Sequence, residues 1–160
     1  GLPGRRERSA SLLPIMAGDA SIRDADVRRQ PLRGGHETIL VVDDEASIRY
    51  YLETFLPSLG YTVLSAQDGQ EASEIFREKG QDVDLVLMDI TLPRKSGREA
   101  ARAIRKIRAG MKIVFTSGYP ADLIRERQLL DDGEVLLLKP LTPTDLAGTV
   151  RAVLDGEAVN

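Results

Sequence analysis

The 160-residue sequence lacks cysteine and tryptophan and contains a single histidine, His36. The absence of cysteine excludes disulfides and thiolate metal sites, and it is typical of proteins in a reducing compartment, so we expect a cytoplasmic location. The sequence also lacks any apolar stretch near the ~20 residues that a membrane span needs. What remains is the composition of a globular domain, with 42% apolar and 29% charged residues.

Charge is divided unevenly along the chain. Residues 1–35 carry seven arginines and four acidic residues, whereas the remaining 125 residues carry 15 basic and 21 acidic side chains. An acidic domain argues against a large nucleic-acid-binding surface. Residues 1–35 also contain three prolines and five glycines without helical or strand periodicity. We therefore predict a linker or disordered lead at 1–35, with a short strand of an upstream domain at Ser11–Ile15, and a folded domain at 36–160.

From Glu37 onward, apolar runs alternate with amphipathic segments. The runs predict strands at 39–42, 61–66, 85–88, 112–115 and 135–138, each followed by a segment of helical apolar spacing. The run 85–88 is apolar at every position, as is typical of a strand covered on both faces of the sheet. Five βα repeats with right-handed crossovers predict an α/β fold, a doubly wound parallel sheet in the flavodoxin-like strand order 2-1-3-4-5.

Local signals predict where the helices begin and end. Gly60 is expected at the C′ position of the first helix, and Pro57 is expected to kink that helix or to tighten its final turn. Asp68 and Thr142 are expected to cap the second and last helices. The fourth helix is expected around 122–130. The residues expected to face inward from the third helix are Ala100, Ala101, Ile104 and Ile107.

Polar side chains with chemical functions follow four of the predicted strands. Asp43 and Asp44 follow the first strand, Asp89 the third, Thr116 the fourth and Lys139 the fifth. Ligands bind at the carboxyl ends of the strands in an open parallel sheet. The sequence therefore predicts one shared site at this edge.

Charge balance indicates what such a site binds. Two carboxylates ~4 Å apart repel each other by ~4 kcal/mol at an effective dielectric of ~20. The ammonium of Lys139 does not balance three carboxylates, and all-oxygen ligands favour a hard divalent ion, Mg²⁺ for preference, which keeps positions for water and phosphate oxygens. Because a carboxylate can form an acyl phosphate, Asp89 at the end of the central strand is the candidate nucleophile.

Four segments around this site are similar in sequence to one known family. They are Ile39–Glu45, Met88–Pro93, Thr116–Gly118 and Lys139–Pro140. Together they make residues 38–155 resemble the receiver domain of two-component response regulators. The resemblance implies a phosphoacceptor signalling domain, in which Asp89 accepts a phosphoryl group from the phosphohistidine of a histidine kinase or phosphotransfer protein and the domain then switches conformation.

The resemblance also implies a ligand set for the metal. Asp44 and Asp89, together with the backbone carbonyl of Thr91, would ligate Mg²⁺, and Asp43 would act through a bound water. These roles agree with the chemistry of phosphoryl transfer, which asks a protein mainly for positioning and for neutralisation of charge.

The residues that contact the phosphoryl group follow from the same resemblance. Thr116 would hydrogen-bond to it, Lys139 would pair with it, and the bond from Lys139 to the following proline is expected to be cis. The family usually carries an aromatic residue three positions before the lysine, which turns inward when the threonine moves, but here this position is Leu136. We expect a weak switch, or transmission through Tyr119 unless that residue is simply a surface aromatic. The face of the fourth helix, fifth strand and last helix is the expected partner contact.

The phosphodonor is expected elsewhere, because His36 precedes the first strand and lacks the helical setting of a phosphodonor histidine. Ser11–Ile15 is similar to the last strand of a histidine-kinase ATP-binding domain, and the last helix is expected to end near Leu154, which leaves no room for a DNA-binding effector after it. We expect the C-terminal receiver of a hybrid sensor kinase, with a stand-alone receiver as the alternative.

Three other functions compete with this interpretation. A haloacid-dehalogenase phosphatase also forms an aspartyl phosphate, but it requires a second Asp two positions after the nucleophile, where Thr91 stands. A phosphorylation-independent interaction module usually lacks one of the acidic or lysine positions, and here all are present. A nucleotide-binding fold would need a G-x-G-x-x-G or Walker loop, which the sequence lacks. As a receiver, the domain is not expected to be an enzyme beyond assisting its own phosphotransfer and autodephosphorylation.

Overall fold

The computed structural model describes residues 32–157 of the chain. The strand expected at Ser11–Ile15, and most of the expected linker, lie outside the described residues. Among the helices of the described part, none is both long enough and apolar enough to cross a membrane.

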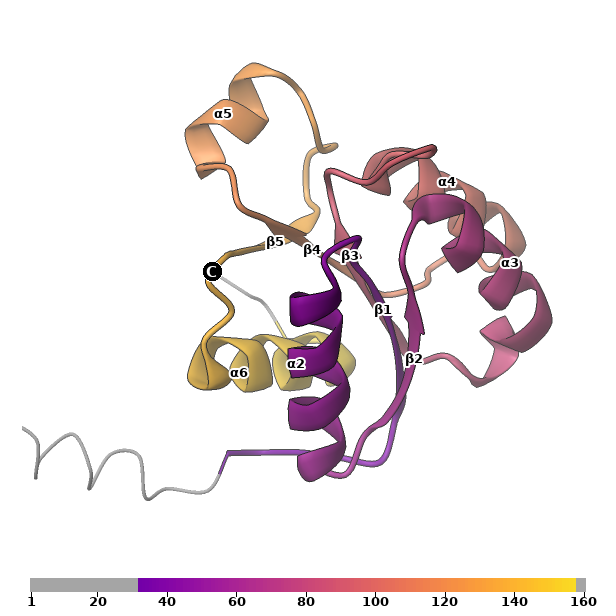
Figure 1. The fold of residues 1–160 in the computed structure, drawn as a ribbon, viewed down its shortest axis with the longest axis vertical. Helices are drawn as coiled ribbons and strands as arrows, with labels where there is room; N and C mark the ends of the chain where they lie inside the picture. Colours follow the sequence, from indigo (N-terminus) through magenta and orange to yellow (C-terminus); the bar gives the residue numbers. More distant parts are fainter. Residues whose placement is uncertain (1–31, 158–160) are drawn as a thin grey trace, which may run out of the picture. The chain divides into compact units, whose positions relative to one another are not determined.

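Five parallel strands form one sheet in the order β2-β1-β3-β4-β5, which confirms the predicted flavodoxin-like arrangement (Figure 1). The strands are β1 (Thr38–Val42), β2 (Thr62–Ala66), β3 (Leu85–Asp89), β4 (Ile113–Ser117) and β5 (Val135–Leu138). Strands β3 and β4 run slightly further than predicted, so that Asp89 and Thr116 are paired neighbours within the sheet. The sheet itself therefore positions these two side chains next to each other.

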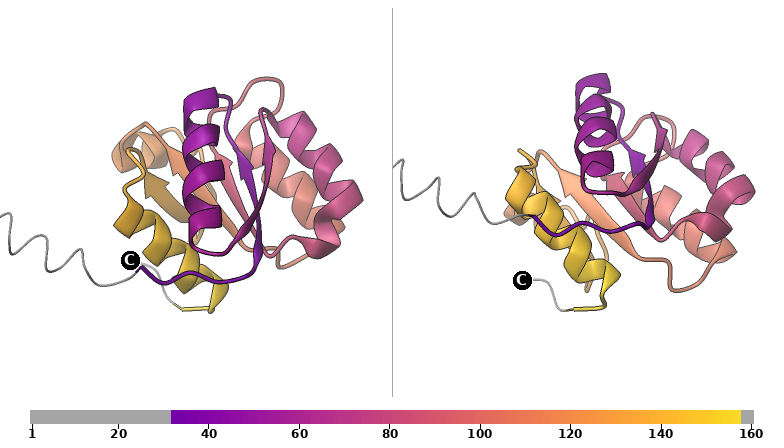
Figure 2. Two further views of the ribbon diagram at one scale, coloured as in Figure 1. Left: turned by 60° about the horizontal axis from the view of Figure 1, so that its bottom comes forward. Right: turned by 90° about the horizontal axis from the view of Figure 1, so that it is seen from below.

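Helices cover both faces of the sheet, as the two further views show (Figure 2). Helices α2 (Ala46–Ser58) and α6 (Pro143–Leu154) lie on one face, and α3 (Gly69–Lys79) and α4 (Gly97–Ile107) on the other. A short 3-10 helix, Gly80–Asp82, follows α3. Each face has its own apolar core. Residues that carry the two cores include Leu52, Leu56, Leu146 and Val150 on the first face, and Ala72, Phe76, Ala100 and Ile104 on the second.

Two expectations about helices are wrong. Ile107 does not face inward but is 49% exposed, because it is the last residue of α4, and Met111 in the following turn is buried in the core instead. Helix α5 (Ala121–Glu126) is shorter than the expected 122–130. Its end is explained by Gln128, whose φ of 53° is left-handed and cannot continue a helix. Of the residues in α5, only Ile124 is buried.

The predicted helix ends are otherwise confirmed. Gly60 has a φ of 102° at the end of α2. Pro57 tightens the final turn, since the Leu59 amide bonds to the Leu56 carbonyl three residues back, at 3.0 Å. Asp68 accepts a hydrogen bond from the Glu71 amide, and Thr142 caps α6 in the same way.

Residues 32–35, which the sequence assigns to the lead, pack with the domain at the amino end of the sheet. The Gly35 amide bonds to the Leu59 carbonyl, and a Cβ at Gly35 would lie 2.4 Å from the guanidinium of Arg151. That guanidinium also reaches the Gly34 carbonyl at 3.0 Å and the Glu37 carboxylate at 2.7 Å. The entering chain is therefore held against α6 by a glycine-dependent close approach and an ion pair.

Candidate phosphoryl and metal site

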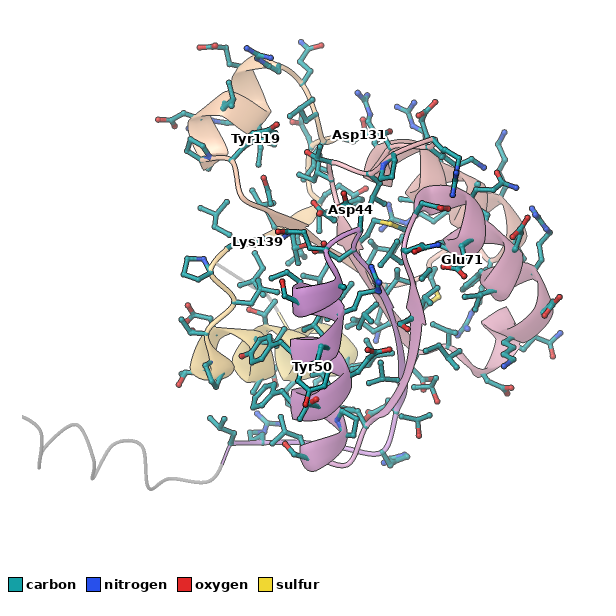
Figure 3. The ribbon with its side chains drawn as sticks, in the orientation of Figure 1. Asp44, Tyr50, Glu71, Tyr119, Asp131 and Lys139 are labelled. Carbon is teal, nitrogen blue, oxygen red and sulfur yellow. The ribbon has the colours of Figure 1, made fainter. Side chains whose placement is uncertain are left out.

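The carboxyl edge of the sheet brings the predicted acidic residues together. Asp43 and Asp89 are buried, with 1% and 5% exposure, and Asp44 is exposed. One carboxylate oxygen from each of the three lies within 4.8 Å of the others. The Lys139 ammonium lies 2.8 Å from Asp43 Oδ2 and 3.3 Å from Asp89 Oδ2. Figure 3 shows Asp44 and Lys139, from the ends of β1 and β5, at this same edge.

Backbone groups hold the two buried carboxylates in place. Asp43 Oδ1 accepts a hydrogen bond from the Glu45 amide at 2.9 Å, and Asp89 Oδ1 accepts one from the Thr91 amide at 3.1 Å. Thr116 is buried beside Asp89 in the strand register. The predicted cis peptide bond after Lys139 is present.

The electrostatics of the site leave negative charge uncompensated. Burial, together with the charge of Asp43, raises the pKa of Asp89 to about 6. Burial opposes the charge on Lys139, but the hydrogen bond from its ammonium to Asp43 and the attraction of both carboxylates outweigh burial, and the pKa of Lys139 is raised. One ammonium therefore lies among the carboxylates of Asp43, Asp44 and Asp89, with the exposed Glu45 carboxylate 3.6 Å away. An all-oxygen donor set with excess negative charge fits a hard divalent cation such as Mg²⁺.

The two candidate switch residues lie in different environments. Tyr119 follows β4, is 44% exposed, and lines a groove of about 680 Å³ whose other lining residues include Ile90 and Thr91 from the loop after β3. Leu136 is half-buried on β5, opposite Phe115, and packs against the core beneath α3 and α4. Tyr119 thus borders the loop after the candidate phosphoacceptor, whereas Leu136 belongs to the core.

One residue near the site was predicted only as a helix cap. Asp68 is buried near the carboxyl end of β2, and its carboxylate pairs with the guanidinium of Arg94 in the loop after β3. Its position in the sequence could have indicated a role in the site, because Asp68 also follows a predicted strand. The role was missed because Gln67 separates Asp68 from the end of that strand. Asp68 thus adds a further carboxylate to the same edge of the sheet.

Comparison with known sequences gives consistent matches. The family model described as "Response regulator receiver domain" matches residues 39–151. The chain is 34% identical to the sensor kinase CckA of Brucella abortus, over 93% of this chain and 15% of the kinase. It is 42% identical to the probable transcriptional regulator ycf27 of Guillardia theta, over 74% of this chain and 45% of the regulator. The chain thus spans less than half the length of either relative.

Solved structures show the same fold. A response regulator receiver domain protein from Clostridium thermocellum is 30% identical, with a TM-score of 0.68, and the match covers 75% of this chain and 95% of that one. A response regulator receiver protein from Sinorhizobium medicae is 31% identical, with a TM-score of 0.66, and the match covers 74% of this chain and 94% of that one. With the family model matching most of the described domain, this chain belongs to the response regulator receiver family of two-component systems.

Proposed function

We propose that this receiver domain accepts a phosphoryl group on Asp89 from a phosphohistidine of a histidine kinase or phosphotransfer protein. The observation that carries the proposal is the buried Asp89 carboxylate at the end of the central strand, within 3.3 Å of the Lys139 ammonium. In the transfer, a carboxylate oxygen of Asp89 forms a bond to phosphorus, and the bond from phosphorus to the donor's imidazole nitrogen breaks with its electron pair. The product is an aspartyl phosphate.

The side chains around Asp89 supply what the transferred group needs. Lys139 would pair with a phosphoryl oxygen as a point charge, and the Thr116 hydroxyl would donate a hydrogen bond to another. The Thr91 amide, which already bonds to Asp89 Oδ1, orients the carboxylate. Positioning and neutralisation are the main demands of this chemistry; these residues would supply the positioning and part of the neutralisation.

The charge balance calls for a cation at this site, and the receiver family implies which residues would hold it. Asp44 and Asp89 with the Thr91 carbonyl would hold Mg²⁺, and Asp43 would act through a water. When bound, the ion would supply the positive charge that neutralises the equatorial phosphoryl oxygens. The raised pKa of Asp89, caused by burial and by Asp43, supports a requirement for further positive charge.

In this proposal, a movement of Thr116 at the end of β4 on phosphorylation is passed on through Tyr119 in the following loop, because Leu136 lacks the ring of the usual aromatic. Tyr119 is anchored by its amide to the Ser117 hydroxyl at 2.8 Å, while its ring borders the groove beside Thr91. Replacing Tyr119 by Ala would then weaken the output and leave phosphorylation of Asp89 unchanged.

The surrounding protein is proposed to be a sensor kinase that acts in the cytoplasm. The match to the Brucella abortus kinase covers 93% of this chain and so extends well into residues 1–31, whereas the match to the ycf27 regulator covers 74%. The downstream partner would contact the face made by α5, β5 and α6.

Acetyl phosphate with Mg²⁺ tests the phosphoacceptor. Intact-mass measurement is expected to show one phosphoryl group per chain, lost in Asp89→Asn and kept in Asp122→Asn, a matched change at an exposed carboxylate. Retained labelling of Asp89→Asn would refute the assignment. Sustained turnover of a phosphomonoester would favour the phosphatase instead, and partner binding that survives Asp89→Ala unchanged would favour the interaction module.

A further inference from the structure

The loops after β2 and β3 touch each other beside the site. A Cβ added to Gly69, at the start of α3, would lie 2.4 Å from the Lys95 carbonyl oxygen. The backbone of the loop after β3 therefore rests directly on the first turn of α3. Position 69 accommodates this contact because glycine has no Cβ.

Asp68, next to this contact, has two partners. Its Oδ1 accepts a hydrogen bond from the Glu71 amide at 2.8 Å, which caps α3, and its Oδ2 pairs with the Arg94 guanidinium. The Asp68 side chain is 4% exposed, whereas that of Arg94 is 68% exposed. A buried carboxylate that bonds to both an amide and a guanidinium makes a directional contact, stronger than a pair of exposed charges.

Arg94 itself has an unusual backbone. Its φ of 67° lies in the left-handed region, which costs a residue with a Cβ on the order of 1 kcal/mol or more. Such a conformation persists only where neighbouring contacts hold it. The ion pair with Asp68 is a contact of this kind.

Both ends of the loop are fixed by other bonds. The Gly97 amide bonds to the Ile90 carbonyl at 2.9 Å, and the Thr91 amide bonds to Asp89. Within the described residues, the Arg94–Asp68 pair is the hydrogen bond that joins the middle of the loop to another element. The segment that carries Thr91 is thus tied to a carboxylate from the loop after a different strand, β2.

We infer that Asp68 is a positioning residue for the phosphoryl site: through Arg94 it holds the loop that carries Thr91 in the conformation needed for Mg²⁺ binding and for acceptance of the phosphoryl group at Asp89. This inference rests on the proposed function. It assigns to the loop after β2 a part in the site that the four strand ends do not account for.

Conservative substitutions separate this role from helix capping. Asp68→Asn keeps an oxygen for the Glu71 amide and so keeps the cap, but it removes the charge that pairs with Arg94. Arg94→Gly relieves the left-handed backbone and removes the pair, whereas Arg94→Lys keeps the charge. Asp122→Asn breaks the exposed pair with Arg125 and is the control.

The first readout is Mg²⁺ affinity, measured by calorimetry without phosphodonor. Asp68→Asn and Arg94→Gly are each expected to weaken binding about tenfold, as is typical when a group that orients a metal ligand is lost. The double variant is expected to be no weaker than either single variant, because both remove the same pair. Arg94→Lys and Asp122→Asn are expected to retain most of the wild-type affinity.

The second readout is hydrogen exchange of the amides of Thr91, Leu92, Arg94 and Lys95 in the metal-free domain, since Pro93 has no amide hydrogen. Exchange is expected to rise in Asp68→Asn, while the protection of α3 stays unchanged because its cap is kept. Unchanged exchange and Mg²⁺ affinity in Asp68→Asn, or additive losses in the double variant, would overturn the inference. If the wild type is not labelled at Asp89, the proposed function fails, and the exchange measurement still decides whether Asp68 holds the loop.

Discussion

Charged side chains cluster at both ends of the sheet, but the two clusters are balanced differently. At the amino end, Arg33 and Arg151 face Glu37 and Asp155, so that two cations meet two carboxylates. At the carboxyl end, the Lys139 ammonium pairs with Asp43, Asp89 and Glu45, and Asp44 adds a further carboxylate to the cluster. The first cluster joins the entering chain to α6, and the second surrounds the candidate phosphoacceptor.

The pKa values of the acids in the two clusters are shifted in opposite directions. The hydrogen bond from Arg151 lowers the pKa of Glu37 to about 2, whereas burial and Asp43 raise the pKa of Asp89 to about 6. The ionised form is therefore favoured by folding at one end and disfavoured at the other. Paired charge thus contributes stability at the amino end, whereas uncompensated negative charge at the carboxyl end favours binding of a cation and a phosphoryl group.

Removing Arg151, the less exposed of the two cations in the amino-end cluster, is expected to have the largest effect on stability. Arg151→Ala leaves Glu37 and Asp155 without their shared partner and breaks the bond to the Gly34 carbonyl. Since the Arg151 side chain is only 12% exposed, we expect a loss of about 3 kcal/mol in the free energy of unfolding, measured with urea. The control Arg125→Ala, at an exposed pair, is expected to lose no more than about 0.5 kcal/mol. Similar losses of unfolding free energy in Arg151→Ala and Arg125→Ala would show that the paired charges at the amino end add no more stability than an exposed pair.

Neutralising the candidate phosphoacceptor is expected to raise the free energy of unfolding, not to lower it. Asp89→Asn removes a buried charge beside Asp43 and keeps an oxygen for the Thr91 amide. At pH 7 without Mg²⁺, we expect the free energy of unfolding to rise by about 1–2 kcal/mol, although labelling is lost. A variant less stable than the wild type would show that the site does not store uncompensated charge.

The smallest expected effect is a pH dependence of the stability that Glu37 contributes at the amino end. Because the folded-state pKa of Glu37, about 2, lies below its ordinary 4.5, its contribution is complete above about pH 4.5 and is lost as the pH falls through about 2. With allowance for solvent screening, Glu37→Gln is expected to cost about 1 kcal/mol at pH 7. Urea titrations from pH 7 to pH 3 should show the gap between Glu37→Gln and the wild type narrowing below pH 4.5. If the difference in unfolding free energy between Glu37→Gln and the wild type stays constant with pH, the contribution of Glu37 comes from packing and not from its charge.

Much of the fold was predictable because its signals are local. Alternation of apolar runs and helical stripes predicted the five strands, the rules for doubly wound sheets predicted their order, and the caps at Asp68 and Thr142 were correct. The errors fall at helix ends, at Ile107, which is the last residue of α4, and at the end of α5, where Gln128 is left-handed, because the exact end of a helix is only weakly encoded by apolar spacing. The second partner of Asp68 was also missed, because Arg94 lies 26 positions away and nothing local connects the two residues.

Local patterns were enough to predict which elements form and which chemical groups stand at the strand ends, because periodicities of 2 and 3.6 residues and short capping motifs belong to short segments. The balance of the charges, in contrast, depends on the folded arrangement. Lys139 meets Asp43 across 96 positions and Arg151 meets Glu37 across 114. Coulombic and desolvation energies depend on distance and burial in space, and both are established only when the sheet and its helices pack together.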